Sequence, residues 1–320
     1  MLDPSAFLYD QKASLKLTVL SEHVQDGTII QDIMYASPRG GEVPAYLIFP
    51  SQQAPRAGLI FGHWGEGNRE EFVDEAVILA RVGFVSLCPD APFLRPVEQE
   101  PPLVEIPQGD LQWIVDVRRG VDLLLERFKL PSEHFGYVGH SYGAAFGGAI
   151  AGVEHRIKAY VLMAGVSALS EYMQTTTHPL LVQERNNTPP EEYRAYLTAL
   201  APLDARHYIG QAAPSHLFFQ FAREDEFVPV KDGERYFELG SSPKQIAWYD
   251  HCNHAFNAQA RLDRAIFLCE QLGLARPSQE ILNLLEQVPS PIPREDYMQA
   301  FMEAKSQLSA GTDTSAATHP

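Results

Sequence analysis

Beyond residue 56, short apolar runs alternate with amphipathic stretches of helix length, and few folds accommodate this alternation. Nearly continuous apolar runs are typical of strands that are buried on both faces of a parallel sheet. When such strands alternate with helices, they form right-handed βαβ units. The sequence therefore predicts an α/β fold with a doubly wound, mostly parallel sheet. The predicted strands span residues 57–64, 83–90, 134–140, 157–165, 215–222 and 244–250, and the predicted helices span 69–81, 110–129, 142–153, 231–239 and 254–272.

Local signals mark the ends of several predicted elements. Residues 14–50 contain three β-rich stretches, LKLTVL, TIIQDIMYA and VPAYLIFP, which are separated by D-G and S-P-R-G-G turn signals. We expect Asn68 to cap the helix at 69–81. The carboxylates of Glu70, Glu71 and Asp74 then occupy its first turns, where the helix dipole favours negative charge.

Two segments interrupt the alternation. Residues 91–108 contain five prolines just after a predicted strand, and residues 167–214 are long for a crossover. The second segment predicts a small cap, with one helix at 189–200. Ligands bind at the carboxyl ends of the strands in open α/β sheets, so both segments are candidate pocket walls. The alternative is that they only decorate the surface.

The predicted elements divide the chain into three parts. Residues 1–272 are expected to form the main domain, with the cap segment inside it at 167–214. Residues 273–308 predict a C-terminal helical extension. The small and polar residues 309–320 predict a disordered tail.

Charge and cysteine content narrow the function classes. The chain has 320 residues and a formal net charge of −16, which disfavours nucleic acid or an anionic membrane as the main partner. No apolar run approaches the roughly 18 residues that a membrane helix needs. The first residues show no basic region followed by an apolar stretch, so we expect no secretory signal. With an odd count of three cysteines, this predicts reduced thiols and a cytoplasmic protein.

Residues 139–143 match G-x-S-x-G between a predicted strand and a predicted helix rich in small residues. This context is the one in which the motif forms a sharp turn that exposes a nucleophilic serine. Side chains two residues before or after the serine would collide at such a turn, which explains Gly139 and Gly143. The sequence predicts Ser141 as the nucleophile. The alternative is a glycine-rich helix start without chemistry.

A serine hydroxyl needs a base that takes its proton. Two histidines follow the last predicted strand, and we favour His254 over His251 because the base must reach the serine sideways from a loop. His251 would then be a polar residue that supports the loop. The H-C-N-H stretch that contains both histidines has no matching second cluster, so we predict no metal site.

The base in turn needs an acid that fixes its tautomer. Asp225 follows the strand predicted at 215–222 and precedes F-V-P, which directs the chain toward a helix. Glu224 and Glu226 flank it, and we interpret them as solvated loop charges. The chain order is then nucleophile, acid and base.

The oxyanion that forms in acyl transfer needs backbone donors. We expect one to be the N–H of Tyr142, the residue after the serine. The second should come from the loop after the strand at 57–64, where we favour Trp64, with Gly65 as the alternative. His63 is interpreted as an anchor of this loop.

With these motifs in this order, the chain resembles the α/β-hydrolase superfamily, and more narrowly its dienelactone-hydrolase-like and acetyl-esterase-like branch. The resemblance covers roughly residues 25–272 and rests on GHWGEGNRE, FVSLCPDAPF, GYVGHSYGAAFGG, LFFQFAREDEFVP and HCNHAF. It departs from the family in two places. Dienelactone hydrolases carry a cysteine where this chain has Ser141, and the loop reads H-W-G rather than the commoner H-G-G.

The resemblance implies a Ser-His-Asp hydrolase that acts on carboxylic esters and requires no cofactor. We expect a small neutral ester as substrate, while the sequence does not identify the residues that bind it. Two alternatives use the same fold: a thioesterase or acyltransferase with the same triad, and a non-catalytic ligand-binding protein. All three triad residues are present, which argues against the last.

Overall fold

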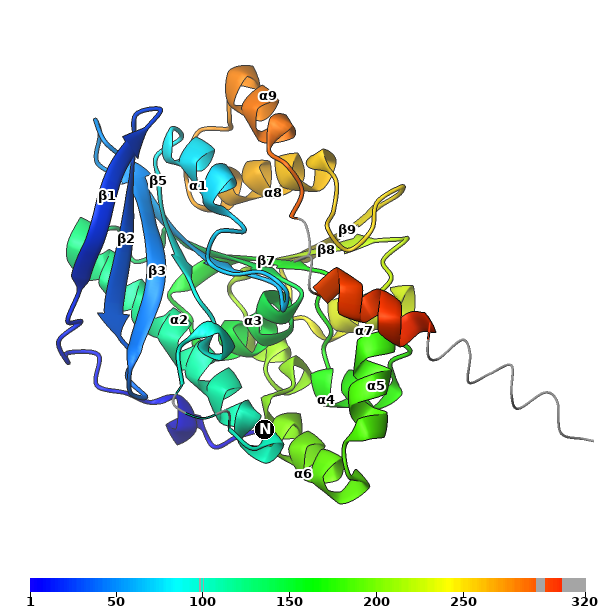
Figure 1. The fold of residues 1–320 in the computed structure, drawn as a ribbon. Helices are drawn as coiled ribbons and strands as arrows, with labels where there is room; N and C mark the ends of the chain where they lie inside the picture. Colours follow the sequence, from blue (N-terminus) through cyan, green and yellow to red (C-terminus); the bar gives the residue numbers. More distant parts are fainter. Residues whose placement is uncertain (98, 100, 292–296, 307–320) are drawn as a thin grey trace, which may run out of the picture.

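The computed structural model describes residues 1–97, 99, 101–291 and 297–306 (Figure 1). A nine-stranded sheet runs through it in the order β1-β2-β3-β5-β4-β6-β7-β8-β9. The strands β1 to β3 and the β3–β5 pair are antiparallel, and all pairs from β5 to β9 are parallel. The strands are β1 (Thr18–Gln25), β2 (Thr28–Ala36), β3 (Glu42–Pro50), β4 (Ala57–Gly62), β5 (Phe84–Pro89), β6 (Phe135–His140), β7 (Ile157–Met163), β8 (His216–Ala222) and β9 (Lys244–Tyr249).

Helices cover both faces of this sheet, which confirms the predicted doubly wound, mostly parallel α/β fold. In Figure 1, α1, α8 and α9 lie above the sheet, and α2, α3 and α7 lie below it. The helices are α1 (Val73–Ala80), α2 (Ile106–Phe128), α3 (Tyr142–Val153), α4 (Leu169–Thr175), α5 (Pro179–Asn187), α6 (Pro190–Leu200), α7 (Val230–Leu239), α8 (Ala258–Gln271) and α9 (Gln279–Gln287). No helix in the described ranges has both the length and the apolar character that crossing a bilayer requires.

Three predicted helix starts are wrong. The helix predicted from residue 110 begins four residues earlier, at Ile106. The first helix begins at Val73 rather than at residue 69, and its cap position, Phe72, makes no side-chain hydrogen bond. Asn68 Oδ1 instead accepts from the N–H of Glu70 at 2.7 Å, in a turn before the helix. This turn stays outside the helix because the N–H of Arg69 is bonded to a carboxylate of another segment, Asp90, at 2.8 Å.

The helix predicted from residue 254 begins at Ala258. The side chain of Asn257 accepts from the N–H of Ala260 at 3.2 Å and caps it. A polar residue in extended conformation thus ends the preceding loop, as is typical of an N-cap. His254 therefore lies in a loop, where its ring is not constrained by helical geometry.

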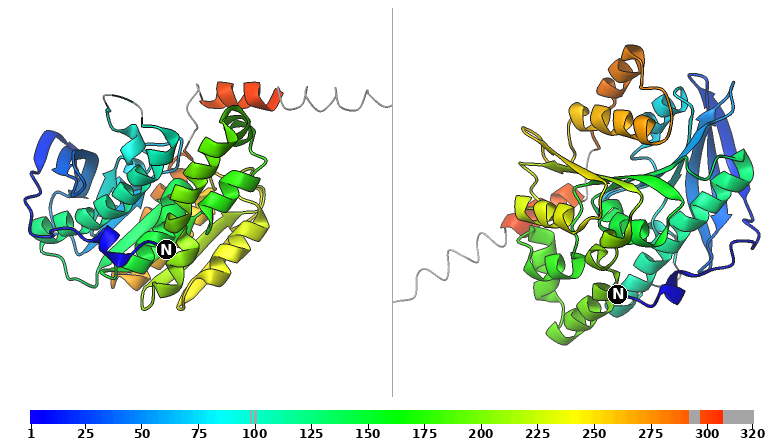
Figure 2. Two further views of the ribbon diagram at one scale, coloured as in Figure 1. Left: turned by 90° about the horizontal axis from the view of Figure 1, so that it is seen from below. Right: turned by 180° about the vertical axis from the view of Figure 1, so that it is seen from behind.

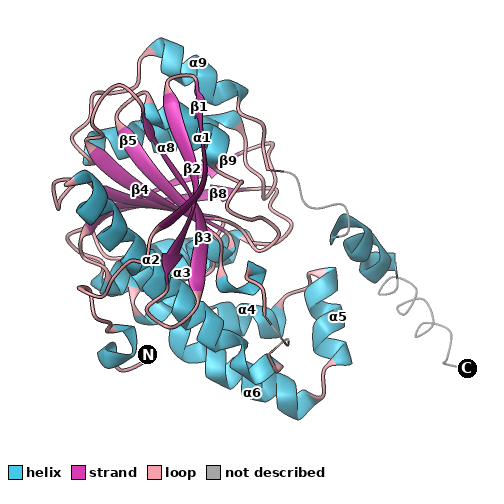
Figure 3. Cartoon of the chain, turned by 60° about the vertical axis from the view of Figure 1, so that its left-hand side comes forward, coloured by secondary structure: helices cyan, strands magenta, loops and turns pink. Residues whose placement is uncertain are grey.

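The predicted cap segment at 167–214 folds into α4, α5 and α6, and the helix predicted at 189–200 is α6. These helices group together below the sheet in the rear view of Figure 2 and apart from the strands in Figure 3. In the predicted extension, α9 packs on α1 and α8, and residues 297–306 form a further helix. The tail predicted at 309–320 lies outside the described residues, and the division at residue 272 stays a prediction.

Close backbone approaches limit side-chain size on α3, which packs against β6 and β7. A Cβ added to Gly152 would lie 2.5 Å from the carbonyl oxygen of Tyr208. Backbone cannot move aside as a side-chain end can. By contrast, a Cβ on Gly109 in α2 would lie 3.6 Å from the nearest atom, in ordinary contact.

We expect Gly152→Ala to lower the free energy of unfolding by about 1–3 kcal/mol because α3 must shift. The matched substitution Gly109→Ala should raise it by up to about 1 kcal/mol, since alanine favours the helix. Denaturant unfolding of both variants measures the two effects. Equal effects would contradict the packing of α3 against Tyr208.

Candidate active site

Ser141 occupies a strained turn between β6 and α3. Its backbone angles are φ 51° and ψ −105°, a region that non-glycine residues rarely adopt. The N–H of Ser141 donates to the carbonyl of Met163, at the end of β7, at 2.8 Å. The turn is thus held in place by the sheet, and this is the local geometry that the G-x-S-x-G motif predicts.

The two glycines of the motif are required by space. A Cβ on Gly139 would lie 2.4 Å from the carbonyl oxygen of Gly143, and a Cβ on Gly143 would lie 2.2 Å from that of Gly62. The N–H of Gly143 also donates to the carbonyl of His63 at 3.1 Å. The start of α3 therefore lies directly against the end of β4, and the predicted collisions are those that the structure shows.

The loops after β8 and β9 bring Asp225 and His254 together. Nδ1 of His254 lies 2.9 Å from Oδ2 and 3.0 Å from Oδ1 of Asp225, and both side chains are almost fully buried. Oδ1 of Asp225 also accepts from the N–H groups of Phe227 and Val228, at 2.8 and 3.0 Å. The carboxylate is thereby fixed, and it orients the ring so that Nδ1 faces the acid and Nε2 is left for another partner.

The charged residues that neighbour Asp225 and His254 in the chain are not part of the buried pair. His251 is 94% exposed and has Glu224 at 3.3 Å, so this pair lies at the surface. Glu226 accepts from the N–H of His254 at 3.4 Å, a contact that sequence reasoning missed. No hydrogen bond joins the hydroxyl of Ser141 to the ring of His254 among the described residues, and such contacts are often long without substrate.

A buried network behind the site connects three loops. Oε2 of Glu71 accepts from the N–H of Trp64 at 2.8 Å, and Oε1 lies 2.6 Å from Nδ1 of His140. Nε2 of His140 donates to the carbonyl of His254 at 2.9 Å. Sequence reasoning missed Glu71 and His140. The signal was His140 itself, a polar residue at the end of a strand that is buried on both faces.

This network contradicts the prediction that the N–H of Trp64 stabilises the oxyanion, because Glu71 already accepts that hydrogen. The alternative donor, Gly65, lies in the same loop, and a Cβ there would meet nothing within 4 Å. Tyr142 begins α3, directly after Ser141. Gly65 is therefore the position of this loop that faces open space.

His63 anchors this loop, as expected. Its Nδ1 donates to the carbonyl of Trp64 at 2.7 Å, and its Nε2 accepts from the N–H of Ala91 at 3.0 Å. These partners fix the neutral tautomer with hydrogen on Nδ1. Burial lowers the pKa of His63, which keeps the ring neutral.

Both interrupting segments reach the site with aromatic side chains. Phe93, from residues 91–108, meets the ring of Tyr142 edge-on at 5.1 Å. His178, from the cap segment, stacks on Phe227 at 4.5 Å, and Phe227 in turn contacts His254 at 4.5 Å. Burial lowers the pKa of His178 to about 4, so this ring contributes as a neutral aromatic wall.

The helix at 297–306 extends this wall. The hydroxyl of Tyr297 lies 3.1 Å from Nε2 of His178, and the ring of Phe301 lies 5.2 Å from the His178 ring. The C-terminal extension therefore packs on the cap segment next to the site. The sequence pattern of this segment gave no signal for the contact.

No group of three or more metal-ligating side chains gathers anywhere in the described part of the chain. The two histidines of H-C-N-H diverge, since His254 is buried against Asp225 and His251 is exposed.

Asp110, on α2, is a buried carboxyl beside the proposed oxyanion donor. Oδ1 accepts from the hydroxyl of Tyr142 at 2.9 Å. Burial raises the pKa of Asp110 from 3.8 to about 7, and burial together with Asp110 raises the pKa of the Tyr142 hydroxyl. The hydroxyl of Tyr142 thus keeps its proton and donates it to the hydrogen bond with Asp110.

Because its pKa is raised on folding, Asp110 stabilises the fold fully below about pH 4 and loses this contribution as the pH rises through about 7. We expect Asp110→Asn, which does not titrate, to gain about 2 kcal/mol in the free energy of unfolding relative to wild type between pH 5 and pH 8. Denaturant unfolding at both values measures this gain. A difference that stays constant with pH would contradict the burial of an ionisable carboxyl here.

Comparisons with known proteins agree with this architecture. Residues 112–264, slightly less than half of the chain, match the model of the prolyl oligopeptidase family. Comparison with curated protein sequences gave no match. Among solved structures, an acetyl xylan esterase from Paenibacillus sp. R4 is 16% identical, with a TM-score of 0.70 over 83% of this chain and 91% of that one.

Two other structures are similar over most of their length. Acetyl xylan esterase 1 from Thermoanaerobacterium sp. JW/SL YS485 is 14% identical, with a TM-score of 0.64 over 78% of this chain and 86% of that one. An S-formylglutathione hydrolase from Agrobacterium tumefaciens is 16% identical, with a TM-score of 0.59 over 80% of this chain and all (100%) of that one. At these identities the likeness establishes the fold, and it agrees with the turn at Ser141. The chain has the α/β-hydrolase fold.

Proposed function

We propose that the protein is a serine esterase in which Ser141 is the nucleophile, His254 the base and Asp225 the acid. The observation that carries the proposal is the strained turn at Ser141, together with the buried His254–Asp225 pair on the loops of the same sheet edge. Strain at a functional residue persists only where the surrounding structure enforces it. Here the close contacts of Gly139 with Gly143 and of Gly143 with Gly62, together with a bond to β7, do so.

The proposed reaction is a two-step acyl transfer. As Ser141 Oγ attacks the ester carbonyl, Nε2 of His254 takes its proton and Asp225 stabilises the imidazolium. The tetrahedral intermediate collapses, the alcohol leaves with that proton, and an acyl-enzyme remains. Water then attacks with the same base, which releases the carboxylic acid and restores Ser141. The reaction uses the side chains of this chain and water.

We assign the oxyanion donors to the N–H groups of Tyr142 and Gly65. Tyr142 follows the nucleophile and begins α3, where the positive end of the helix dipole adds to the field. Gly65 replaces our first choice, Trp64, whose N–H is bonded to Glu71. His63 supports this loop through the carbonyl of Trp64.

For the substrate we propose a small neutral carboxylic ester. The net charge of −16 disfavours anionic ligands at long range. Two similar structures are named acetyl xylan esterases, which supports a short acyl group. The aromatic walls built by Phe93, Phe227 and His178 offer apolar surface of limited size.

We place the enzyme in the cytoplasm. All three cysteines, Cys88, Cys252 and Cys269, are unpaired and buried thiols, as is typical of a reducing compartment.

The same triad would also serve a thioesterase or acyltransferase. The partial match to the prolyl oligopeptidase family adds amide bonds as a competing substrate class.

We expect Ser141→Ala and His254→Ala each to lower kcat by about a millionfold, because nucleophile and base act as a unit. His251→Ala is the control and should keep most of the activity, since its ring is exposed and away from Asp225. Initial rates on one p-nitrophenyl ester compare the three variants. A fluorophosphonate probe should label Ser141 alone in the wild type, and it should not label Ser141→Ala. If His251→Ala is the inactive variant instead, the base is misassigned.

The substrate proposal predicts that kcat/KM is highest for short acyl chains. Acetyl, butyryl, octanoyl and palmitoyl p-nitrophenyl esters test chain length, acetyl-CoA tests an anionic thioester, and a peptide p-nitroanilide tests amide cleavage. An optimum at palmitoyl, or faster turnover of acetyl-CoA or the anilide than of the acetyl ester, would overturn the preference. It would leave the triad assignment intact.

A further inference from the structure

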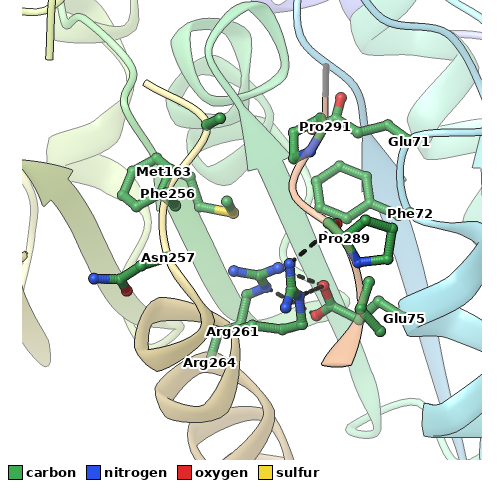
Figure 4. Close-up of a pocket in the computed structure, with 12 residues that line it drawn as sticks. Glu71, Phe72, Glu75, Met163, Phe256, Asn257, Arg261, Arg264, Pro289 and Pro291 are labelled. Atoms are coloured by element: carbon green, nitrogen blue, oxygen red, sulfur yellow. Dashed lines mark hydrogen bonds and ion pairs between the residues drawn. The ribbon is translucent and has the colours of Figure 1, made fainter. Parts of the chain in front are cut away.

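A cavity of about 20 Å³ lies beside Phe256 and Asn257, which follow His254 in the same loop (Figure 4). Its walls come from α1, from the start of α8 and from the chain after α9, with Glu75, Arg261, Arg264 and Pro289 among the lining residues. Such a volume holds one water molecule or one monatomic ion. The site is separate from Ser141 and has no part in the proposed reaction.

Two buried arginines share a single carboxylate at this cavity. Arg264 donates to Glu75 through both Nε, at 2.8 Å, and Nη2. Nε of Arg261 lies 3.8 Å from Glu75, while its two terminal nitrogens donate to the carbonyls of Leu285 and Pro289, at 2.9 and 3.3 Å. The three charged side chains are each at most 5% exposed. Two cations therefore face one anion, out of contact with solvent.

The other carboxylate at the cavity, Glu71, does not compensate this excess. Nε2 of His140 donates to the carbonyl of His254, so the short contact between Nδ1 and Glu71 needs a second proton on the ring or on the carboxyl. In either case the Glu71–His140 pair is neutral in sum. Asp74, which precedes Glu75 on α1, is exposed to solvent. The walls thus carry one net positive charge.

Two donors at the cavity also lack acceptors. Nη1 of Arg264 and Nε of Arg261 are buried and make no hydrogen bond with any described residue. A buried charged donor without an acceptor is costly, and an uncompensated buried charge more so. A water molecule would satisfy the donors but would leave the charge. A monatomic anion would accept hydrogen bonds from the two donors and would also neutralise the excess positive charge.

We propose that this cavity is a binding site for a single halide ion, chloride under physiological conditions, held by Arg261 and Arg264. Its volume excludes sulfate, phosphate and carboxylate ligands. The ion joins α1 to α8 and to the chain after α9, and it thereby fixes the C-terminal extension behind the His254 loop. The inference does not depend on the proposed esterase activity.

The test is thermal unfolding of the full chain in sodium chloride against sodium gluconate at equal ionic strength. Gluconate is too large for the cavity, so only chloride should raise Tm, by about 2 °C and with saturation. Sodium bromide should act like chloride. An equal Tm in chloride and gluconate at all concentrations would overturn the proposal.

Arg261→Met removes one cation and leaves Arg264 and Glu75 as a balanced pair, so the chloride effect should vanish. The matched control is Arg276→Met, which removes an arginine that is 66% exposed and should keep the full effect. Should Arg261→Met fail to fold, crystals of the wild-type protein grown in bromide decide. We expect an anomalous peak beside Nη1 of Arg264, and a water molecule without such a peak would refute the site.

Discussion

The contact between the end of β4 and the start of α3 determines the rest of the site. A side chain on Gly143 would lie 2.2 Å from the carbonyl oxygen of Gly62, so glycine alone permits this approach. Because the helix begins so close to the sheet, Ser141 is forced into its strained turn, and the loop after β4 lies beside it. The positions of the proposed nucleophile and of both proposed oxyanion donors follow from one backbone contact.

A second constraint is the buried hydrogen-bond network around Glu71. Glu71 bonds to the N–H of Trp64 and to the ring of His140, which holds the carbonyl of His254. One carboxylate thus links the loop after β4, the end of β6 and the loop that carries the proposed base. Buried polar groups are stable only when every partner is in place, and here three segments become a single rigid unit. The proposed halide site lies against the same unit and extends it to α8 and α9.

The sequence predictions were right where a feature follows from a pattern of neighbouring residues, and wrong where a residue outside that pattern formed a hydrogen bond. Strand positions and the pairing of Asp225 with His254 were predictable, because each follows from a periodic pattern or from a loop of fixed length after a strand. The cap predicted at Asn68 was wrong because the N–H of Arg69 is bonded to Asp90, which lies 21 residues further along the chain. Trp64 failed as a donor for a similar reason, since Glu71 takes its hydrogen. In both cases a carboxylate outside the motif accepted the hydrogen, Asp90 in the first and Glu71 in the second.

The sequence by itself determined the α/β class, the order of the strands along the chain and the turn at Ser141, since apolar periodicity and steric exclusion act between near neighbours. Only the tertiary structure decided which donors remain available and how Asp110, His178 and Tyr297 lie around the site. It alone brought Arg261 and Arg264 to Glu75, nearly 190 residues away in the chain. Hydrogen-bond partners and buried charges are settled by packing between distant segments, and no local pattern encodes them.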